Sequence, residues 1–281
     1  MIKTYSVSLV ILFLLSCSLT PQDQNSNKTK YVGSRYVAEV HAKKSCFNNI
    51  KQLLYKSTDP DLIISEIEEA KNVYFDLHLD LNNLQSLHPF NSRVTQKRDA
   101  IRSIRKKIQS LQSKLYRSGK GYKTIQMEYS YIGETNYLAL DPFFKDKKIY
   151  YLNEAEREQF KVNISEDGIL RWSNGSRIST RSRNYGHSGM GIFVMDNEGN
   201  IYLHVDYKNQ YNGEGYIRHS SFLSGLPISA AGELLIENGI LKTVTRKSGH
   251  YTPSKSINNL FLHHLENEGV DLSEVDSIKG Y

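Results

Sequence analysis

The chain has 281 residues, of which 39% are hydrophobic. It is therefore long enough to bury the core of one large domain or two modest ones, which excludes a disordered tail. A formal charge of +6 at pH 7 would suit a nucleic-acid or anionic-membrane partner, but the basic residues are concentrated in one place. Residues 93–123 hold eleven Lys or Arg against one acid, Asp99, so the rest of the chain is acidic and a nucleic-acid partner is not favoured.

The N-terminus has the pattern of a targeting segment. Lys3 precedes an apolar run, residues 5–15, that is too short to span a membrane. The run ends in Leu14-Leu15-Ser16-Cys17, which resembles a bacterial lipobox. That resemblance implies a signal peptide over residues 1–16 and lipidation of Cys17, whose palmitate-like acyl chains would anchor the protein to a membrane.

The expected location is therefore the bacterial cell envelope, lipid-anchored at the outer membrane or cell surface. The alternative is an ordinary signal peptide and a secreted protein. Residues 17–35 are polar and lack hydrophobic periodicity, which predicts a flexible tether. The other cysteine is Cys46, so an acylated Cys17 leaves neither an intramolecular disulfide nor a cysteine-based metal site.

Residues 36–121 are predicted to contain an antiparallel helical hairpin. Asp59-Pro60 is an N-terminal helix signal, residues 88–92 interrupt the pattern, and Gly119 and Gly121 end it. The apolar positions recur at spacings of three and four. In the first helix they are Ile63, Ile67, Ala70, Tyr74, Leu77, Leu81, Leu84 and Leu87, and in the second Val94, Ile101, Ile104, Ile108, Leu111 and Leu115.

The two predicted helices carry opposite charge. The first is rich in Asp and Glu, whereas the second holds the basic run. An acidic helix laid antiparallel to a basic one would neutralise it internally. The alternative is a basic surface that binds nucleic acid, calmodulin or anionic lipid heads.

Residues 122–281 are predicted to form an antiparallel β-sheet domain with appended helices, so the fold class is α+β. The clearest signal is a hairpin of residues 232–237 and 240–245, because Asn238-Gly239 between them suits a type I′ turn. A second hairpin is expected at residues 191–195 and 201–205. Asn153 is expected to cap a short helix, and Pro253 to begin a C-terminal one.

Two polar clusters flank the first hairpin, and a hairpin that returns on itself would bring them toward one edge of the sheet. The first cluster is His219-Ser220-Ser221 and the second is Ser248-Gly249-His250-Tyr251. Any chemistry is expected at this edge. The Arg-rich stretch with Arg171, Arg177, Arg181 and Arg183 could hold a phosphate or form an exposed basic loop.

The C-terminal half resembles the C-terminal domain of the plant IQ-motif-containing calmodulin-binding proteins, over about residues 147–278. The blocks that carry this resemblance are Tyr151-Leu152, Glu156-Arg157, Ile192-Phe193-Val194-Met195, His219-Ser220-Ser221-Phe222-Leu223, Ala230-Ala231-Gly232, Asn238-Gly239, Ser248-Gly249-His250-Tyr251, Pro253 and Val270-Asp271-Leu272. The family's calmodulin-binding element does not carry over, because the best candidate, Ile108-Gln109, has Ser113 where Lys or Arg is needed. Calmodulin is therefore not an expected partner.

Three hypotheses remain for the polar clusters. In an ADP-ribosyltransferase-like site, His219 would bind a ribose, Tyr251 would stack on nicotinamide and Glu233 would supply the acid. In a hydrolase-like site, Ser220 or Ser221 would be the nucleophile and His250 the base, with Glu233 or Asp271 orienting it. In the third, His219, Ser220, His250 and Tyr251 form a buried hydrogen-bond network that closes the sheet edge.

The sequence favours a binding module over an enzyme. The expected function is that of a lipid-anchored bacterial protein whose C-terminal domain binds a protein or small molecule, with host interaction as one use. A secreted effector or toxin-like enzyme is the alternative. No cofactor is expected, and a metal site formed from His187, His204, His219 and His250 is not expected either, because no pair has helical i, i+4 spacing.

Overall fold

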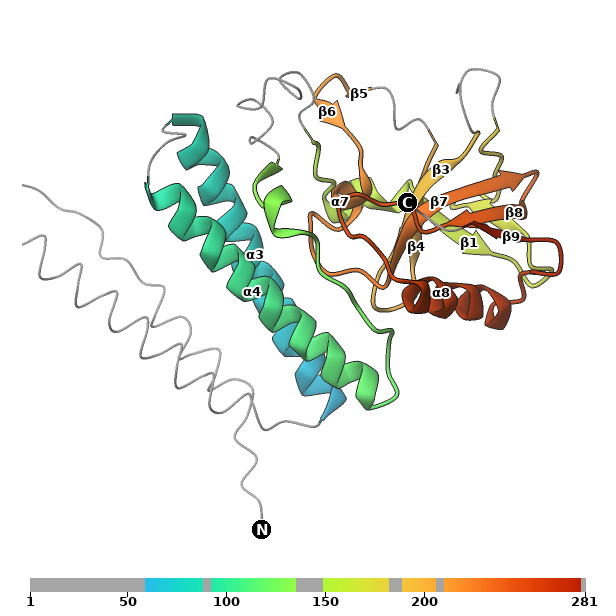
Figure 1. Cartoon of the computed structure of the whole chain (residues 1–281), viewed down its shortest axis with the longest axis horizontal. Helices are drawn as coiled ribbons and strands as arrows, with labels where there is room; N and C mark the ends of the chain where they lie inside the picture. The colour runs from blue at the N-terminus through green and yellow to red at the C-terminus, as the bar shows by residue number, and fades with distance from the viewer. Residues whose placement is uncertain (1–58, 88–91, 135–148, 182–188, 206–209, 279–281) are drawn as a thin grey trace, which may run out of the picture. The chain divides into compact units, whose positions relative to one another are not determined.

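The computed structural model describes residues 59–87, 92–134, 149–181, 189–205 and 210–278 (Figure 1). Residues 58–281 form one compact unit, in which the helix pair and the sheet domain pack on each other. The predicted signal peptide, the tether with Cys17, and the start of the predicted hairpin region lie outside the described residues. The boundaries predicted from the sequence at residues 16 and 35 therefore stay predictions, and the predicted domain boundary at 121 stays a prediction as well.

The predicted helical hairpin is present as α3 (Pro60–Leu87) and α4 (Ser92–Arg117), which lie side by side (Figure 1). Asp59 caps α3, because its Oδ1 accepts a hydrogen bond of 3.0 Å from the amide of Asp61. The predicted seam of α4 is buried throughout. Gly119 has φ of +84° beyond the end of α4, a backbone conformation that favours glycine.

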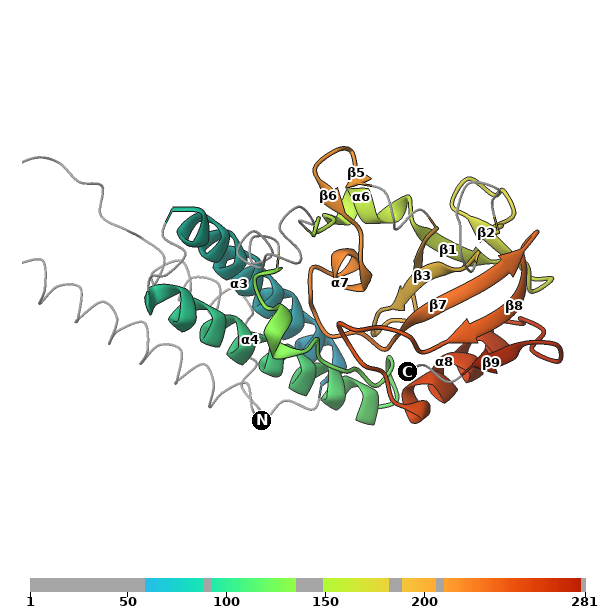
Figure 2. The same ribbon diagram turned by 45° about the horizontal axis from the view of Figure 1, so that its top comes forward.

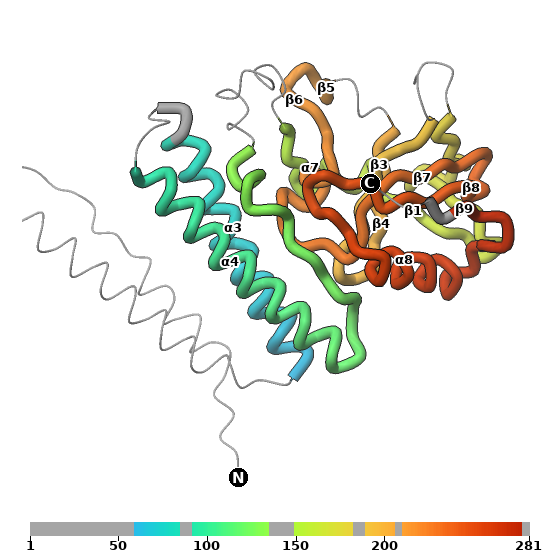
Figure 3. The backbone as a smooth tube through the Cα atoms, viewed as in Figure 1, coloured from blue at the N-terminus to red at the C-terminus, as the bar shows by residue number. Residues whose placement is uncertain are grey.

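The stretch that follows α4 runs back along that helix to the sheet domain, through the short 3₁₀ helix η1 (Tyr129–Tyr131) (Figure 3). Residues 122–134 are here called the connecting strap. Hydrogen bonds hold the strap on both sides. Gln109 donates to the carbonyl of Thr124 at 2.9 Å, and the amide of Ile125 donates to the carbonyl of Ile228 at 2.7 Å.

The main sheet has seven strands in the order β2-β1-β4-β3-β7-β8-β9, and a small second sheet pairs β5 with β6. Neighbouring strands are antiparallel except β8 and β9, which are parallel. The strands are β1 (Lys161–Ile164), β2 (Leu170–Trp172), β3 (Gly191–Met195), β4 (Ile201–His204), β5 (Gln210–Tyr211), β6 (Gly215–Tyr216), β7 (Ala230–Glu237), β8 (Ile240–Thr245) and β9 (Asp276–Ile278). The α+β fold class is thus confirmed, whereas the parallel strand β9 was not predicted.

Both predicted hairpins are confirmed. Between β7 and β8, Asn238 has φ of +51° and Gly239 has φ of +84°, as a type I′ turn requires. A Cβ at Gly239 would lie 2.4 Å from Cγ2 of Ile169, so packing as well as backbone conformation selects glycine there.

The sheet is covered on both faces, and strand β3 shows how. Its alternate residues Ile192 and Val194 join one hydrophobic cluster with the helix pair, whereas Phe193 and Met195 join a second cluster on the opposite face. The second cluster is completed by α8 (Lys255–Asn267), which lies along the sheet in Figure 2. Ser254 caps α8, which agrees with the predicted helix start.

Charge pairing between the helices occurs, as the neutralisation hypothesis requires. Lys97 lies 2.5 Å from Asp80 on the neighbouring helix, and Lys120 lies 3.7 Å from Asp61. These pairs are exposed, so each contributes only about 0.2 to 1 kcal/mol. Within the described ranges, neither helix has the apolar length needed to cross a bilayer.

Candidate functional site

The first predicted polar cluster forms a short buried helix, α7 (His219–Phe222). His219 Nε2 donates to the carbonyl of Gly232 at 2.8 Å, and burial lowers the pKa of His219 to about 3, so the ring is neutral at pH 7. Ser221 Oγ accepts a hydrogen bond of 2.8 Å from the amide of Arg218 and so caps the helix. The Ser220 hydroxyl is fully buried and has no hydrogen-bond partner among the described residues.

The second predicted cluster follows β8 and contains a buried tyrosine and a partly accessible histidine. The Tyr251 hydroxyl donates to the carbonyl of Leu226 at 2.9 Å, and burial raises the Tyr251 pKa well above its usual value. His250 is partly accessible, with 15% of its side chain exposed, and its ring lies 4.4 Å from that of Tyr131. The hydrogen bond of Tyr251 links the second cluster to the loop that follows the first.

The carboxylate that pairs with His250 is one that the sequence analysis did not select. Glu134 Oε2 lies 2.9 Å from His250 Nε2, and Glu134 Oε1 accepts a 2.9 Å hydrogen bond from the hydroxyl of Tyr151. Only 1% of the Glu134 side chain is exposed. Glu134 was missed because it is 116 positions from His250 and lies before the blocks that carry the family resemblance. Tyr151 belongs to one of the blocks that carry the family resemblance and donates a hydrogen bond to Glu134, so a search for its partner could have found Glu134.

Glu233 and Asp271, which the sequence suggested as groups that orient His250, have partners other than His250. Glu233 is half-buried, lies 3.9 Å from Lys247, and has a pKa raised by burial. Asp271 is exposed and accepts from the amide of Ser273. In the described part of the chain, no hydrogen bond joins Ser220 or Ser221 to His250. Ser221 and His250 bond to other groups, the Arg218 amide and Glu134.

The residues considered for metal or phosphate binding are only partly described. The described residues contain no group of three His, Cys, Asp or Glu placed to hold a metal ion, and His187 lies outside the described residues. Of the Arg-rich stretch, Arg171 donates to the carbonyl of Gly175 at 3.0 Å and Arg181 lies 3.2 Å from Glu237. Arg183 also lies outside the described residues.

A groove of about 900 Å³ opens between α3 and the sheet domain. It is here called the α3 groove. One wall is a face of α3, and the other comes from α6 (Glu154–Glu158), the β3–β4 turn and the loop after α7. The residues of the α3 wall are Glu68, Lys71, Asn72, Phe75, His78, Leu79 and Asn82.

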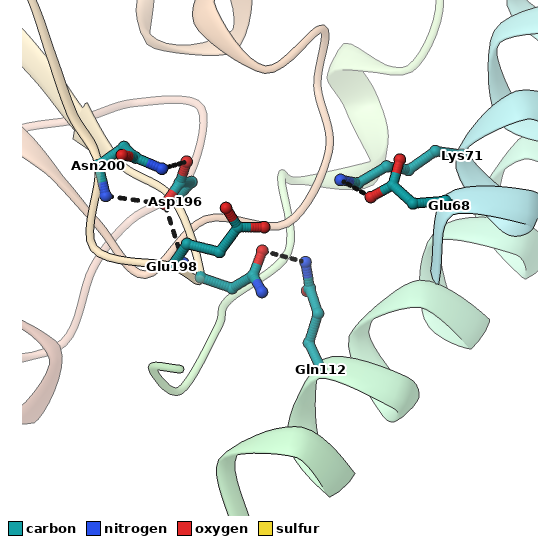
Figure 4. A network of polar contacts seen from close by, with 7 residues as sticks. Glu68, Lys71, Gln112, Asp196, Glu198 and Asn200 are labelled. Carbon is teal, nitrogen blue, oxygen red and sulfur yellow. Dashed lines mark hydrogen bonds and ion pairs between the residues drawn. The ribbon is translucent and has the colours of Figure 1, made fainter. Parts of the chain in front are cut away.

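Hydrogen bonds fix the polar parts of the groove (Figure 4). Asp196 Oδ1 accepts from the amides of Glu198 and Asn200, both at 2.9 Å, which holds the β3–β4 turn in shape. Gln112 of α4 donates to Asn197 Oδ1 at 3.1 Å and so ties this turn to the helix pair. The wall of α6 is set by a capping box between Asn153 and Glu156.

His78 is the one lining residue of the α3 groove whose buried ring nitrogens both lack a hydrogen-bond partner among the described residues. Its side chain is only 5% exposed and its ring lies 4.6 Å from the ring of Tyr74. Burial and the nearby charge of Arg105 lower the pKa of His78 to about 3. A neutral imidazole with two buried hydrogen-bonding atoms that lack partners costs stability.

Comparison with known proteins supports an IQM-like domain in the C-terminal half. The family profile described as the IQ motif-containing protein middle domain matches residues 156–258. IQ domain-containing protein IQM1 of Arabidopsis thaliana is 37% identical over 127 residues, which is 45% of this chain and 24% of that protein. IQM3 of the same plant is 34% identical over 132 residues, 47% of this chain and 27% of that protein. The chain thus spans about a quarter of these relatives, and no solved structure matches.

The adjacent serines of α7 provide a test of the site geometry. We expect Ser221→Ala to lower the free energy of unfolding by about 1 kcal/mol, because the Arg218 amide loses its acceptor. We expect Ser220→Ala to leave it unchanged or slightly higher, because that hydroxyl has no partner to lose. Urea unfolding of both variants measures the difference, and a larger loss in Ser220→Ala would contradict the described hydrogen bonding.

Proposed function

We propose that this protein is a lipid-anchored binding module whose ligand occupies the α3 groove, with the IQM-like domain forming one wall. The observation that carries the proposal is the groove itself, whose volume of about 900 Å³ lies within the range of about 300–1,000 Å³ that small-molecule sites occupy.

The residues of the two polar clusters support binding rather than catalysis. His219, Ser221 and Tyr251 each use their polar atoms in hydrogen bonds to the backbone, so these atoms hold the fold together. A toxin-like or hydrolase-like enzyme would need a reactive group within reach of a base. The Glu134 and His250 pair is the feature that such an enzyme would use, and a secreted effector remains the second candidate on that basis.

The membrane anchor rests on the sequence. The lipobox-like segment at Leu14-Leu15-Ser16-Cys17 and the polar residues 17–35 would hold the groove at the cell envelope, at the end of a lipid-anchored tether. A ligand met in that location would come from the surroundings, and a host molecule is one such source.

Calmodulin is not part of this proposal. The IQ-like pair is engaged in packing, because Ile108 is fully buried and Gln109 donates to the carbonyl of Thr124 at 2.9 Å. If calmodulin bound α4 at this pair, Ile108 would have to become exposed and the hydrogen bond of Gln109 would have to break.

The anchor is tested by replacing the lipidated cysteine. We expect the full chain to enter the detergent phase in a two-phase partition, and Cys17→Ala to enter the aqueous phase, because acyl chains supply the membrane affinity. Cys46→Ala, which keeps the lipobox-like segment, should behave like the wild type. Equal partitioning of the wild type and Cys17→Ala would contradict the anchor.

The groove is tested by thermal shifts of the full chain against a panel of sugars, nucleotides, NAD, phosphate, divalent metals and short peptides. A ligand at about 100 times its dissociation constant adds about 2.7 kcal/mol, which raises the melting temperature by a few degrees. We expect the shift to vanish in Leu79→Glu, since Leu79 is 62% exposed and lines the groove.

The matched control is Leu62→Glu, which changes an exposed leucine of the same helix outside the groove. It should keep the shift. A ligand whose shift survives Leu79→Glu but disappears in Leu62→Glu would place the binding site elsewhere on α3.

A further inference from the structure

A buried histidine lies at the point where α3 meets the sheet domain, and the inference drawn from it rests on the proposed function of the α3 groove. The ring centre of His78 lies 4.6 Å from that of Tyr74 on the same helix and 5.7 Å from that of Tyr151, which precedes α6. Both ring nitrogens are buried and have no hydrogen-bond partner among the described residues. The imidazole is therefore held in place by packing rather than by hydrogen bonds.

The surroundings of His78 do not suit a positive charge. A protonated ring carries two N–H donors, and both would need acceptors in a buried position. The charge that acts on the ring from α4 is that of Arg105, which repels a second cation. Tyr74 and Tyr151 supply no negative charge near neutral pH, because burial raises the pKa of each hydroxyl above its ordinary value. The carboxylate of Glu134 is already bonded to the hydroxyl of Tyr151.

Protonation of His78 and docking of α3 therefore oppose each other. Burial, with the charge of Arg105 as a second cause, lowers the pKa of the docked ring from its ordinary value of 6.5 to about 3. A ring that has moved into water binds a proton below about pH 6.5. The effect is absent well above that pH and grows as the pH falls toward 3. For one proton, this linkage shifts the equilibrium toward an open helix by about thirtyfold between pH 7.5 and pH 5.0.

The docked part of α3 can open while the sheet keeps much of its own core. The hydrophobic cluster on the far face of the sheet is formed, within the described ranges, by residues between positions 122 and 275. The first turns of α3 pack on α4 in a separate cluster of Ile63, Ile67, Leu111 and Leu115. Tyr74, one turn before His78, donates its hydroxyl hydrogen to the carbonyl of Ser224. Tyr74 and His78 thus mark the stretch of α3 that docks on the sheet domain, and opening of this stretch leaves the far-face cluster intact.

We propose that His78 is an acid-sensitive contact, which holds α3 against the sheet domain at neutral pH and releases it as the pH falls. His78 belongs to the α3 wall of the groove and Tyr151 to the opposite wall. Release of α3 therefore separates the two walls. A ligand that the α3 groove holds at neutral pH is then set free in acidic surroundings.

The test is hydrogen-exchange mass spectrometry of the full chain in detergent, without ligand, at pH 7.5 and pH 5.0. The protection of amides in peptides that cover residues 70–84 reports how often this part of α3 opens, once the intrinsic exchange rate at each pH is corrected for. The wild type is compared with His78→Phe, which keeps an aromatic ring beside Tyr74 and Tyr151 but cannot bind a proton. We expect the protection of α3 to fall about thirtyfold more in the wild type than in this variant.

A matched control separates this histidine from the others. His263→Gln removes an exposed histidine of α8 and should show the same acid-dependent loss as the wild type. Glu66 on α3 and His219 on α7 also have pKa values shifted by burial, but both are present in every protein compared, so their contributions cancel. If His78→Phe does not fold, His78→Leu replaces it with the same expected result. Exchange of the ring C2 hydrogen of His78 in the wild type is a second measurement, and we expect a neutral ring at pH 5.0.

Two results would overturn the inference. One is an equal fall of α3 protection in the wild type and in the His78 variant that folds. The other is a His78 ring that binds its proton above pH 6 while α3 remains protected. Both measurements are made without ligand, so either result leaves the proposed binding function standing. Conversely, a panel of ligands that produces no thermal shift would overturn the binding function and leave the acid-dependent release of α3 as measured.

Discussion

The carboxylate of Glu134 is almost fully enclosed in the protein, and an enclosed carboxylate must be compensated by hydrogen bonds or charge. Two donors approach it, the hydroxyl of Tyr151 and the ring nitrogen of His250. The three residues come from the end of the connecting strap, the segment before α6 and the segment after β8. Removing one partner of such a buried group typically costs about 3 to 5 kcal/mol, so the Glu134 contacts constrain where all three segments can lie.

The same region ties the helix pair to the sheet. The guanidinium of Arg105 on α4 is buried and donates to the carbonyl of Met127 in the strap at 2.8 Å. The hydroxyl of Tyr74 on α3 donates to the carbonyl of Ser224 beyond α7. The Tyr251 hydroxyl donates to the carbonyl of Leu226 in the same loop. The α3 groove exists because these contacts hold α3 against the sheet domain while leaving one side of the helix uncovered.

The parts of the fold that the sequence predicts are those decided within a few residues. The helix cap at Asn153, the turn at Asn238-Gly239 and the buried stripe of α4 depend on neighbours in the chain, and all three are present. The parallel strand β9 could not be predicted, because three residues at the chain end acquire their role only by pairing with β8. The partner of His250 could not be predicted either, since no local pattern links positions 134 and 250. His78 occupies a helical position whose apolar neighbours suggest core, and only the three-dimensional packing shows that it borders a groove.

If the helix pair and the sheet are held as one unit by these buried contacts, they should unfold together. The one tryptophan of the chain, Trp172, lies on β2 and reports on the sheet by fluorescence, whereas helical circular dichroism is dominated by α3 and α4. We expect the two signals to follow a single coincident transition in urea. Loss of the helical signal at a lower urea concentration than the fluorescence change would show that the helix pair is a separate folding unit, and would contradict the account of the groove given above.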